Sequence, residues 1–216
     1  MLIMEISVSI IIVLLMILLS YSWLKNEKVQ LFFKSHRSLH PNSICLWRII
    51  ASPFLVFGTC MCYLCNEPEI LSVIIIFYVF FFASDMLDGQ VARTCNMETK
   101  EGAAFDPFAD KLLDLPILFA LSFIHYDLFL IFIAIMIIIL DIMGQFMRKG
   151  ASNPAANWIG KTKTVLKIIT IYILSLYRFP DLWDLIEKFW LADTLMWLSL
   201  IFAFASMASK KISANN

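Results

Sequence analysis

The sequence predicts an all-α polytopic membrane protein built as a bundle of transmembrane helices. Apolar residues make up 61% of the chain and charged residues 16%, and the mean hydropathy is +0.81, values that exclude an ordinary soluble globular protein. Because about 20 apolar residues are needed to cross a bilayer, seven segments qualify as spans. They are approximately residues 3–24, 44–65, 69–88, 106–124, 127–147, 163–179 and 190–208.

The amino-terminal part of the chain precedes the main bundle and divides in two. Residues 1–24 carry Glu5 near their start, where a signal peptide would have basic residues, and they lack an A-x-A cleavage site. These features favour a retained transmembrane anchor over a cleaved signal peptide. Residues 25–43 are basic with interspersed apolar positions, as in an amphipathic helix on the anionic inner surface; a plain connector is the alternative. Residues 44–216 contain the other six spans and form the main membrane domain.

The basic residues predict how the spans are oriented. If the first span runs inward and the others alternate, all 17 Lys and Arg residues except Arg178 and Lys188 face the inside. This asymmetry obeys the positive-inside rule and places the carboxyl terminus on the cytoplasmic side. The connections between spans are short, so no soluble domain fits between them.

The five cysteines are predicted to act mainly as small apolar residues. They are Cys45, Cys60, Cys62, Cys65 and Cys95. An odd number, mostly within one apolar segment, does not indicate a disulfide framework. A soft-metal site at Cys60, Cys62 and Cys65 is the alternative, but no His lies near these three.

Four carboxylates lie close together in the sequence at the boundary of the membrane. Asp85 and Asp88 are three residues apart and Asp106 and Asp110 are four apart, so on helices each pair projects from one face. A turn around Gly102 would bring the two pairs together. Since acids at this depth need compensation and no His or Cys is expected to join them, the sequence predicts a divalent-cation site that suits Mg²⁺ or Mn²⁺ better than Zn²⁺.

Two other interpretations of these acids are open. In the first they are structural and pair with Arg93, Lys100 and Lys111, although the acids, with Asp114 as the weakest member of the group, outnumber those bases. In the second they line the pathway of an ion transporter, which would distribute carboxylates across the membrane depth. The observed acids gather at one face, which favours the cation site.

Residues 85–110 carry a resemblance to a known family. They match the pattern D-x2-D-G-x2-A-R-x8-G-x3-D-x3-D throughout, and this pattern resembles the signature of the CDP-alcohol phosphotransferases. The resemblance extends from about Pro41 to the carboxyl terminus and implies a six-helix catalytic domain, here with one extra amino-terminal transmembrane helix.

The resemblance also implies an active site. Two divalent cations, Mg²⁺ or Mn²⁺, would be ligated by Asp85, Asp88, Asp106 and Asp110, and Asp110 would also act as the catalytic base. The CDP-linked donor, CDP-diacylglycerol, would contact a set that includes two glycines. These donor-binding residues are Asp85, Asp88, Gly89, Ala92, Arg93 and Gly102.

A second basic group indicates the acceptor. The grouping Gly160-Lys161-Thr162-Lys163-Thr164 is similar to the same region of bacterial phosphatidylglycerophosphate synthases, where basic residues hold the phosphate of sn-glycerol 3-phosphate. The resemblance implies transfer of the phosphatidyl group to that acceptor, giving phosphatidylglycerophosphate and CMP. The acceptor-phosphate ligands implied are Arg48, Arg148, Lys161 and Lys163.

Some positions depart from that branch of the family. Eight residues before the position of Arg148, that branch usually has an arginine, but this chain has Leu140, which Asp141 follows. Before its first arginine, that branch usually has a threonine, but this chain has Cys45. The run that begins at Leu140 is similar to phosphatidylinositol synthases, so inositol or inositol phosphate is the alternative acceptor.

The expected partners are therefore the lipid bilayer, the CDP-lipid and a small alcohol phosphate, with no nucleic acid. Homodimers are common in the family, and a homodimer is compatible with the resemblance. We expect an integral protein of the bacterial inner membrane with its active site at the cytoplasmic face.

Overall fold

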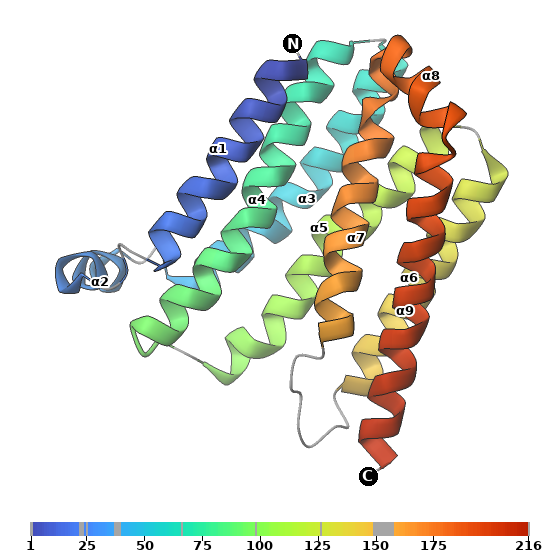
Figure 1. Cartoon of the computed structure of the whole chain (residues 1–216). Helices are drawn as coiled ribbons and strands as arrows, with labels where there is room; N and C mark the ends of the chain where they lie inside the picture. The colour runs from blue at the N-terminus through green and yellow to red at the C-terminus, as the bar shows by residue number, and fades with distance from the viewer. Residues whose placement is uncertain are drawn as a thin grey trace. The chain divides into compact units, whose positions relative to one another are not determined.

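The computed structural model describes residues 2–21, 24, 26–36, 40–65, 67–97, 99–125, 127–148 and 158–215. Every regular element within these ranges is helical, which confirms the predicted fold class. The elements in chain order are α1 (Leu2–Tyr21), α2 (Glu27–Ser35), α3 (Pro41–Leu64), α4 (Pro68–Thr94), α5 (Lys100–Ile124), α6 (Leu128–Arg148), α7 (Trp158–Ser175), the 3-10 helix η3 (Leu176–Arg178), α8 (Pro180–Lys188) and α9 (Leu191–Asn215) (Figure 1).

Several helix limits follow from local sequence chemistry. Pro41, Pro68 and Pro180 each begin a helix, at a position where the missing N–H removes no intrahelical hydrogen bond. The side chain of Asn26 caps α2 by accepting a hydrogen bond from the Lys28 backbone N–H at 3.0 Å. Asn96, directly after α4, adopts φ 52°, a left-handed conformation that asparagine tolerates and that turns the chain toward α5.

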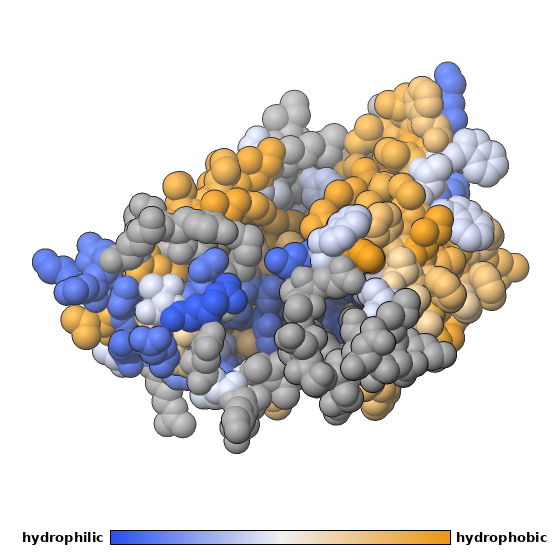
Figure 2. Space-filling model, turned by 60° about the horizontal axis from the view of Figure 1, so that its bottom comes forward, coloured by the Kyte–Doolittle hydropathy of each residue, from blue (hydrophilic) through white to orange (hydrophobic). Residues whose placement is uncertain are grey.

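A helix occupies each of the seven segments predicted to span the membrane. Four helical stretches in the described part are long and apolar enough to cross a bilayer. They are Pro41–Leu64, Glu69–Thr94, Leu128–Phe146 and Leu191–Ser209. Hydrophobic side chains also cover much of the surface seen in Figure 2. The chain is thus an integral membrane protein, and the crossing of the bilayer by α1, α5 and α7 stays a prediction.

The chain divides into two compact units, Met1–Leu113 and Asp114–Asn216. In the first unit α1 and α3 each pack along α4, and α2 contacts α4 as well (Figure 1). Phe33 of α2 is buried in a cluster with Leu87 and Val91 of α4. The amphipathic segment is therefore anchored to a neighbouring helix, while its position on the membrane surface stays a prediction.

The second unit is built around α9, along which both α6 and α7 pack. Thr170 of α7 and Ser199 of α9 share a buried hydrogen bond of 3.2 Å. His125, between α5 and α6, hydrogen-bonds the Leu174 carbonyl at 3.0 Å and stacks on Trp183 of α8 with ring centroids 4.5 Å apart. Burial lowers the pKa of His125, so the imidazole is neutral at pH 7 and serves this packing.

Candidate functional site

The four motif aspartates meet in the first unit around one arginine. Asp85 and Asp88 come from the carboxyl-terminal part of α4, and Asp106 and Asp110 from the amino-terminal part of α5. Arg48 of α3 contacts all four of them. Its Nη1 donates to Asp85 at 2.8 Å and to Asp110 at 2.5 Å, and its Nη2 donates to Asp88 at 2.5 Å and to Asp106 at 2.8 Å. The two pairs lie together as their spacing predicted.

The turn that brings them together differs from the prediction. It was expected around Gly102, but α4 continues to Thr94 and α5 already begins at Lys100. The chain reverses at Asn96, and Gly102 lies within the first turn of α5. Both aspartate pairs therefore lie on regular helices, which fix the direction of each side chain.

Arg48 is the buried cation of this cluster. Its side chain is 0% exposed, and both terminal nitrogens are hydrogen-bonded to carboxylates. A buried charge is tolerated only when it is paired, and four carboxylates satisfy that need. The sequence predicted Arg48 as an acceptor-phosphate ligand; in this structure its contacts are with the aspartates.

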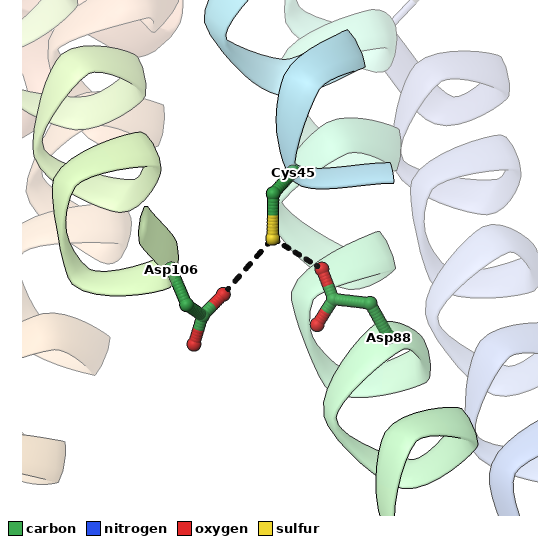
Figure 3. Close-up of side chains that lie close together, drawn as sticks. All are labelled: Cys45, Asp88 and Asp106. Atoms are coloured by element: carbon green, nitrogen blue, oxygen red, sulfur yellow. Dashed lines mark hydrogen bonds between the residues drawn. The ribbon is translucent and has the colours of Figure 1, made fainter. Parts of the chain in front are cut away.

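Cys45 is a member of the cluster that sequence reasoning missed. Its Sγ donates hydrogen bonds to Asp88 and Asp106, each at 3.4 Å (Figure 3). It also accepts one from Arg48 Nη2 at 3.2 Å. The available signal was the three-residue spacing between Cys45 and Arg48, which places both on one face of α3.

The donor atoms of the cluster fit a divalent cation. Two groups hold ligand atoms that all lie within 4.8 Å of one another, one formed by Asp85, Asp106 and Asp110 and the other by Cys45, Asp88 and Asp106. Carboxylate oxygens are the ligands that Mg²⁺ and Mn²⁺ prefer. The acidic cluster can therefore hold a metal ion.

Gly102 lies where a side chain would meet two neighbouring side chains. A Cβ built on it would lie 2.4 Å from Asn42 Oδ1 of α3 and 2.9 Å from Thr99 Oγ1. Asn42 Nδ2 in turn donates to Thr99 Oγ1 at 3.3 Å. Gly89 is different, because its nearest neighbour would be Arg93 Nη2 at 3.6 Å, an ordinary contact distance. A Cβ at Gly102 would thus displace neighbouring side chains, whereas a Cβ at Gly89 would be in ordinary contact with the Arg93 guanidinium.

We expect Gly102→Ala to destabilise the first unit by about 1 kcal/mol, the low end of the usual cost of overpacking, because the Asn42 and Thr99 side chains that the added methyl group meets can move away. Thermal unfolding in detergent measures the effect. Gly89→Ala is the matched control and should unfold at or a few degrees above the temperature of the parent protein, because the added methyl group meets no atom closer than 3.6 Å and alanine favours the helix interior over glycine. Equal unfolding temperatures for the two variants would contradict the steric role of Gly102.

The second basic group lies in the second unit and is paired with acids. Lys163 Nζ of α7 contacts Asp141 Oδ1 of α6 at 2.6 Å. Lys167 Nζ contacts Asp141 Oδ2 and Asp114 Oδ2, each at 3.1 Å. All four side chains are buried. Lys161 is exposed, and the side chain of Arg148 lies outside the described residues.

Sequence reasoning did not predict these ion pairs. Lys167 was counted only for the topology, and Asp141 only as a departure at the position after Leu140. The signal was a single acid in an apolar helix, which requires a partner, together with two lysines four residues apart on one face of the next helix. Asp114, the weakest of the predicted acids, pairs with Lys167 in the second unit.

The chain is similar to known proteins over most of its length. A family model described as CDP-alcohol phosphatidyltransferase matches residues 38–205. The similar curated proteins include the CDP-diacylglycerol–glycerol-3-phosphate 3-phosphatidyltransferase of Bacillus subtilis (strain 168), 32% identical over 61% of this chain and 67% of the relative. Proteins of the same name from Salmonella choleraesuis and Escherichia coli (strain K12) are 34% and 33% identical, each over 66% of this chain and 79% of the relative. No solved structure matches.

Proposed function

This chain belongs to the CDP-alcohol phosphatidyltransferase family, and we propose that it transfers the phosphatidyl group from CDP-diacylglycerol to sn-glycerol 3-phosphate, releasing CMP. The observation that carries the proposal is the convergence of all four motif aspartates in one cluster with the donor chemistry for a divalent cation. The acceptor is supported by the names of the relatives from three bacteria, which favour glycerol 3-phosphate over inositol.

The aspartates bind the metal and the diphosphate end of the donor in this proposal. Two divalent cations, Mg²⁺ or Mn²⁺, would be held by Asp85, Asp88, Asp106 and Asp110. When bound, they would neutralise negative charge on the diphosphate and on the departing CMP. Among these side chains Asp88 is only 3% exposed and Asp110 is 37% exposed. The buried Asp88 is thus suited to be a metal ligand on the inner side of the cluster, and a substrate can reach the more exposed Asp110.

Asp110 acts as the general base. The hydroxyl oxygen of the acceptor forms a bond to the β-phosphorus of the donor, the bond from that phosphorus to the CMP oxygen breaks, and the hydroxyl proton passes to Asp110. A carboxylate in this role must lie within hydrogen-bond reach of the hydroxyl. Its position in the first turns of α5, at the exposed side of the cluster, suits that reach.

The remaining site residues are assigned to the two substrates. Gly89, Ala92, Arg93 and Gly102, together with Asp85 and Asp88, form the cradle for the CDP moiety; the guanidinium of Arg93 lies beside Gly89, which supports a shared role for these two residues. The acceptor phosphate is assigned to Arg48, Arg148, Lys161 and Lys163. Two or more cations on one phosphate give both affinity and orientation.

The reaction is assigned to the cytoplasmic face of the bacterial inner membrane. The predicted positive-inside topology supports this face, and the donor's acyl chains remain in the bilayer while its head group reaches the aspartates. A homodimer remains compatible with the family.

The test is a comparison of acceptors with purified protein. We expect CMP release from CDP-diacylglycerol with sn-glycerol 3-phosphate in the presence of Mg²⁺ or Mn²⁺, and none with serine, inositol or inositol phosphate. Chelation with EDTA should abolish the release and added metal should restore it, since the carboxylates need a cation to bind the diphosphate. Release with inositol but not with glycerol 3-phosphate would overturn the proposed acceptor. Ion flux in proteoliposomes without CDP-lipid would instead favour a transporter.

A further inference from the structure

Four buried charged side chains of the second unit form a continuous chain of ion pairs. In order they are Asp114 of α5, Lys167 of α7, Asp141 of α6 and Lys163 of α7, and we call them the charge chain. The signs alternate along it, and two lysines balance two aspartates. Each carboxylate or ammonium is therefore compensated within the helices.

The two lysines of the charge chain differ in what they join. Lys167 lies between two carboxylates and links α7 to both α5 and α6. Lys163 links α7 to α6 again, through the same Asp141, so it adds no new connection between helices. Helix packing therefore explains Lys167 better than it explains Lys163.

The ammonium of Lys163 lies at one end of the charge chain, and its ion pair with Asp141 is the shortest of the three in the chain. An ammonium has three N–H donors, and the 2.6 Å ion pair with Asp141 uses one of them. The group therefore retains donors for a phosphate oxygen.

We propose that Asp141 is a positioning residue for the acceptor: its Oδ1 fixes the ammonium of Lys163 toward the acceptor phosphate, while its Oδ2 is held in place by Lys167. This inference rests on the proposed function, in which Lys163 binds that phosphate. A lysine side chain is flexible, and a carboxylate that fixes it beforehand reduces the ordering needed when the acceptor binds.

The experiment compares Asp141→Asn with Asp114→Asn in the purified full-length enzyme. Asp141→Asn should raise the KM for glycerol 3-phosphate at least tenfold, with kcat changed less than threefold and the KM for CDP-diacylglycerol unchanged. Asp114→Asn is the matched control, because it removes a buried carboxylate from the same charge chain but leaves the ion pair between Asp141 and Lys163. Its acceptor KM should stay within twofold of the parent value. Asp141→Glu, which keeps the charge, should return the acceptor KM to within threefold.

Thermal unfolding separates positioning from loss of structure. We expect a larger decrease in the unfolding temperature for Asp141→Asn, because Asp141 pairs with two lysines and Asp114 with one. Kinetics measured well below both unfolding temperatures should show a raised acceptor KM for Asp141→Asn alone. If Asp141→Asn does not accumulate in the membrane, Lys163→Arg replaces it, because a guanidinium keeps the pairing with Asp141 but moves the donors; its acceptor KM should rise tenfold.

The possible outcomes distinguish this inference from the proposed function. An unchanged acceptor KM in Asp141→Asn, or an equal rise in Asp114→Asn, would overturn the positioning role while the reaction itself stands. If the enzyme uses a different phosphorylated alcohol, the proposed acceptor is wrong, and the same KM comparison with that alcohol still tests Asp141.

Discussion

Asp110→Asn is expected to reduce kcat for CMP release by about a thousandfold or more. General base catalysis typically contributes about 10²–10⁴-fold, and the same substitution weakens one of the proposed metal ligands. Release of labelled CMP from CDP-diacylglycerol, measured with saturating glycerol 3-phosphate, gives the rate. The loss should persist at high concentrations of Mg²⁺ or Mn²⁺, because added metal does not replace the base.

The stability of the same variant should not fall. Four carboxylates surround one guanidinium in this cluster, so removing one negative charge lowers the repulsion among those that remain. The Asn side-chain oxygen can still accept the hydrogen bond from Arg48 Nη1. We therefore expect an unfolding temperature equal to or above that of the parent protein, which would separate the lost activity from misfolding.

Asp184→Asn provides the control for Asp110→Asn. Asp184 is exposed on α8 in the second unit, and no role in the reaction is assigned to it. Its substitution should leave kcat within twofold. If Asp110→Asn retained full turnover, the base would have to be another carboxylate, and Asp106, whose side chain is 41% exposed, would be the first to test.

The fold class and the convergence of the aspartates could be predicted because both depend on short-range periodicity. The length of each apolar stretch predicts a helix, and acids three or four residues apart must share a helix face. The limits of the helices were less predictable. The apolar part of α4 ends near Asp88, but the helix continues through polar residues to Thr94, because hydropathy marks membrane depth and not the end of the hydrogen-bonded helix.

The choice of long-range partners could not be predicted from spacing. Arg48 precedes Asp85 by 37 residues, and no local pattern decides whether a buried arginine contacts these acids or a substrate phosphate. The same holds for Asp141. A buried acid in an apolar helix needs a cation as partner, but Lys161, Lys163 and Lys167 were all available on the following helix. The arrangement of α6 and α7, which both pack along α9, decides which of these lysines Asp141 meets.

Arg48→Met is expected to cause the largest loss of stability, on the order of 3–5 kcal/mol, the typical effect of removing one partner from a buried ion pair. The side chain is 0% exposed and contacts four carboxylates within 2.8 Å. Met fills a similar volume, so the effect measures the loss of the cation and not the opening of a cavity. Thermal unfolding in detergent and EDTA measures it. Arg93→Met, which removes an exposed arginine from α4, should change the unfolding temperature by no more than a degree or two.

A divalent cation should partly restore the Arg48→Met variant. If the carboxylates bind metal as proposed, adding Mg²⁺ or Mn²⁺ supplies positive charge to the same oxygens that the guanidinium contacted, and binding to the folded state alone raises its stability. The rise in unfolding temperature on adding metal should therefore be larger for Arg48→Met than for the parent protein. Arg48→Lys should lie between them, because an ammonium carries the charge but lacks the planar fork that reaches four carboxylates. An equal response to metal in all three proteins would mean that the cation binds away from the cluster, and the four aspartates would then lose their assignment as ligands.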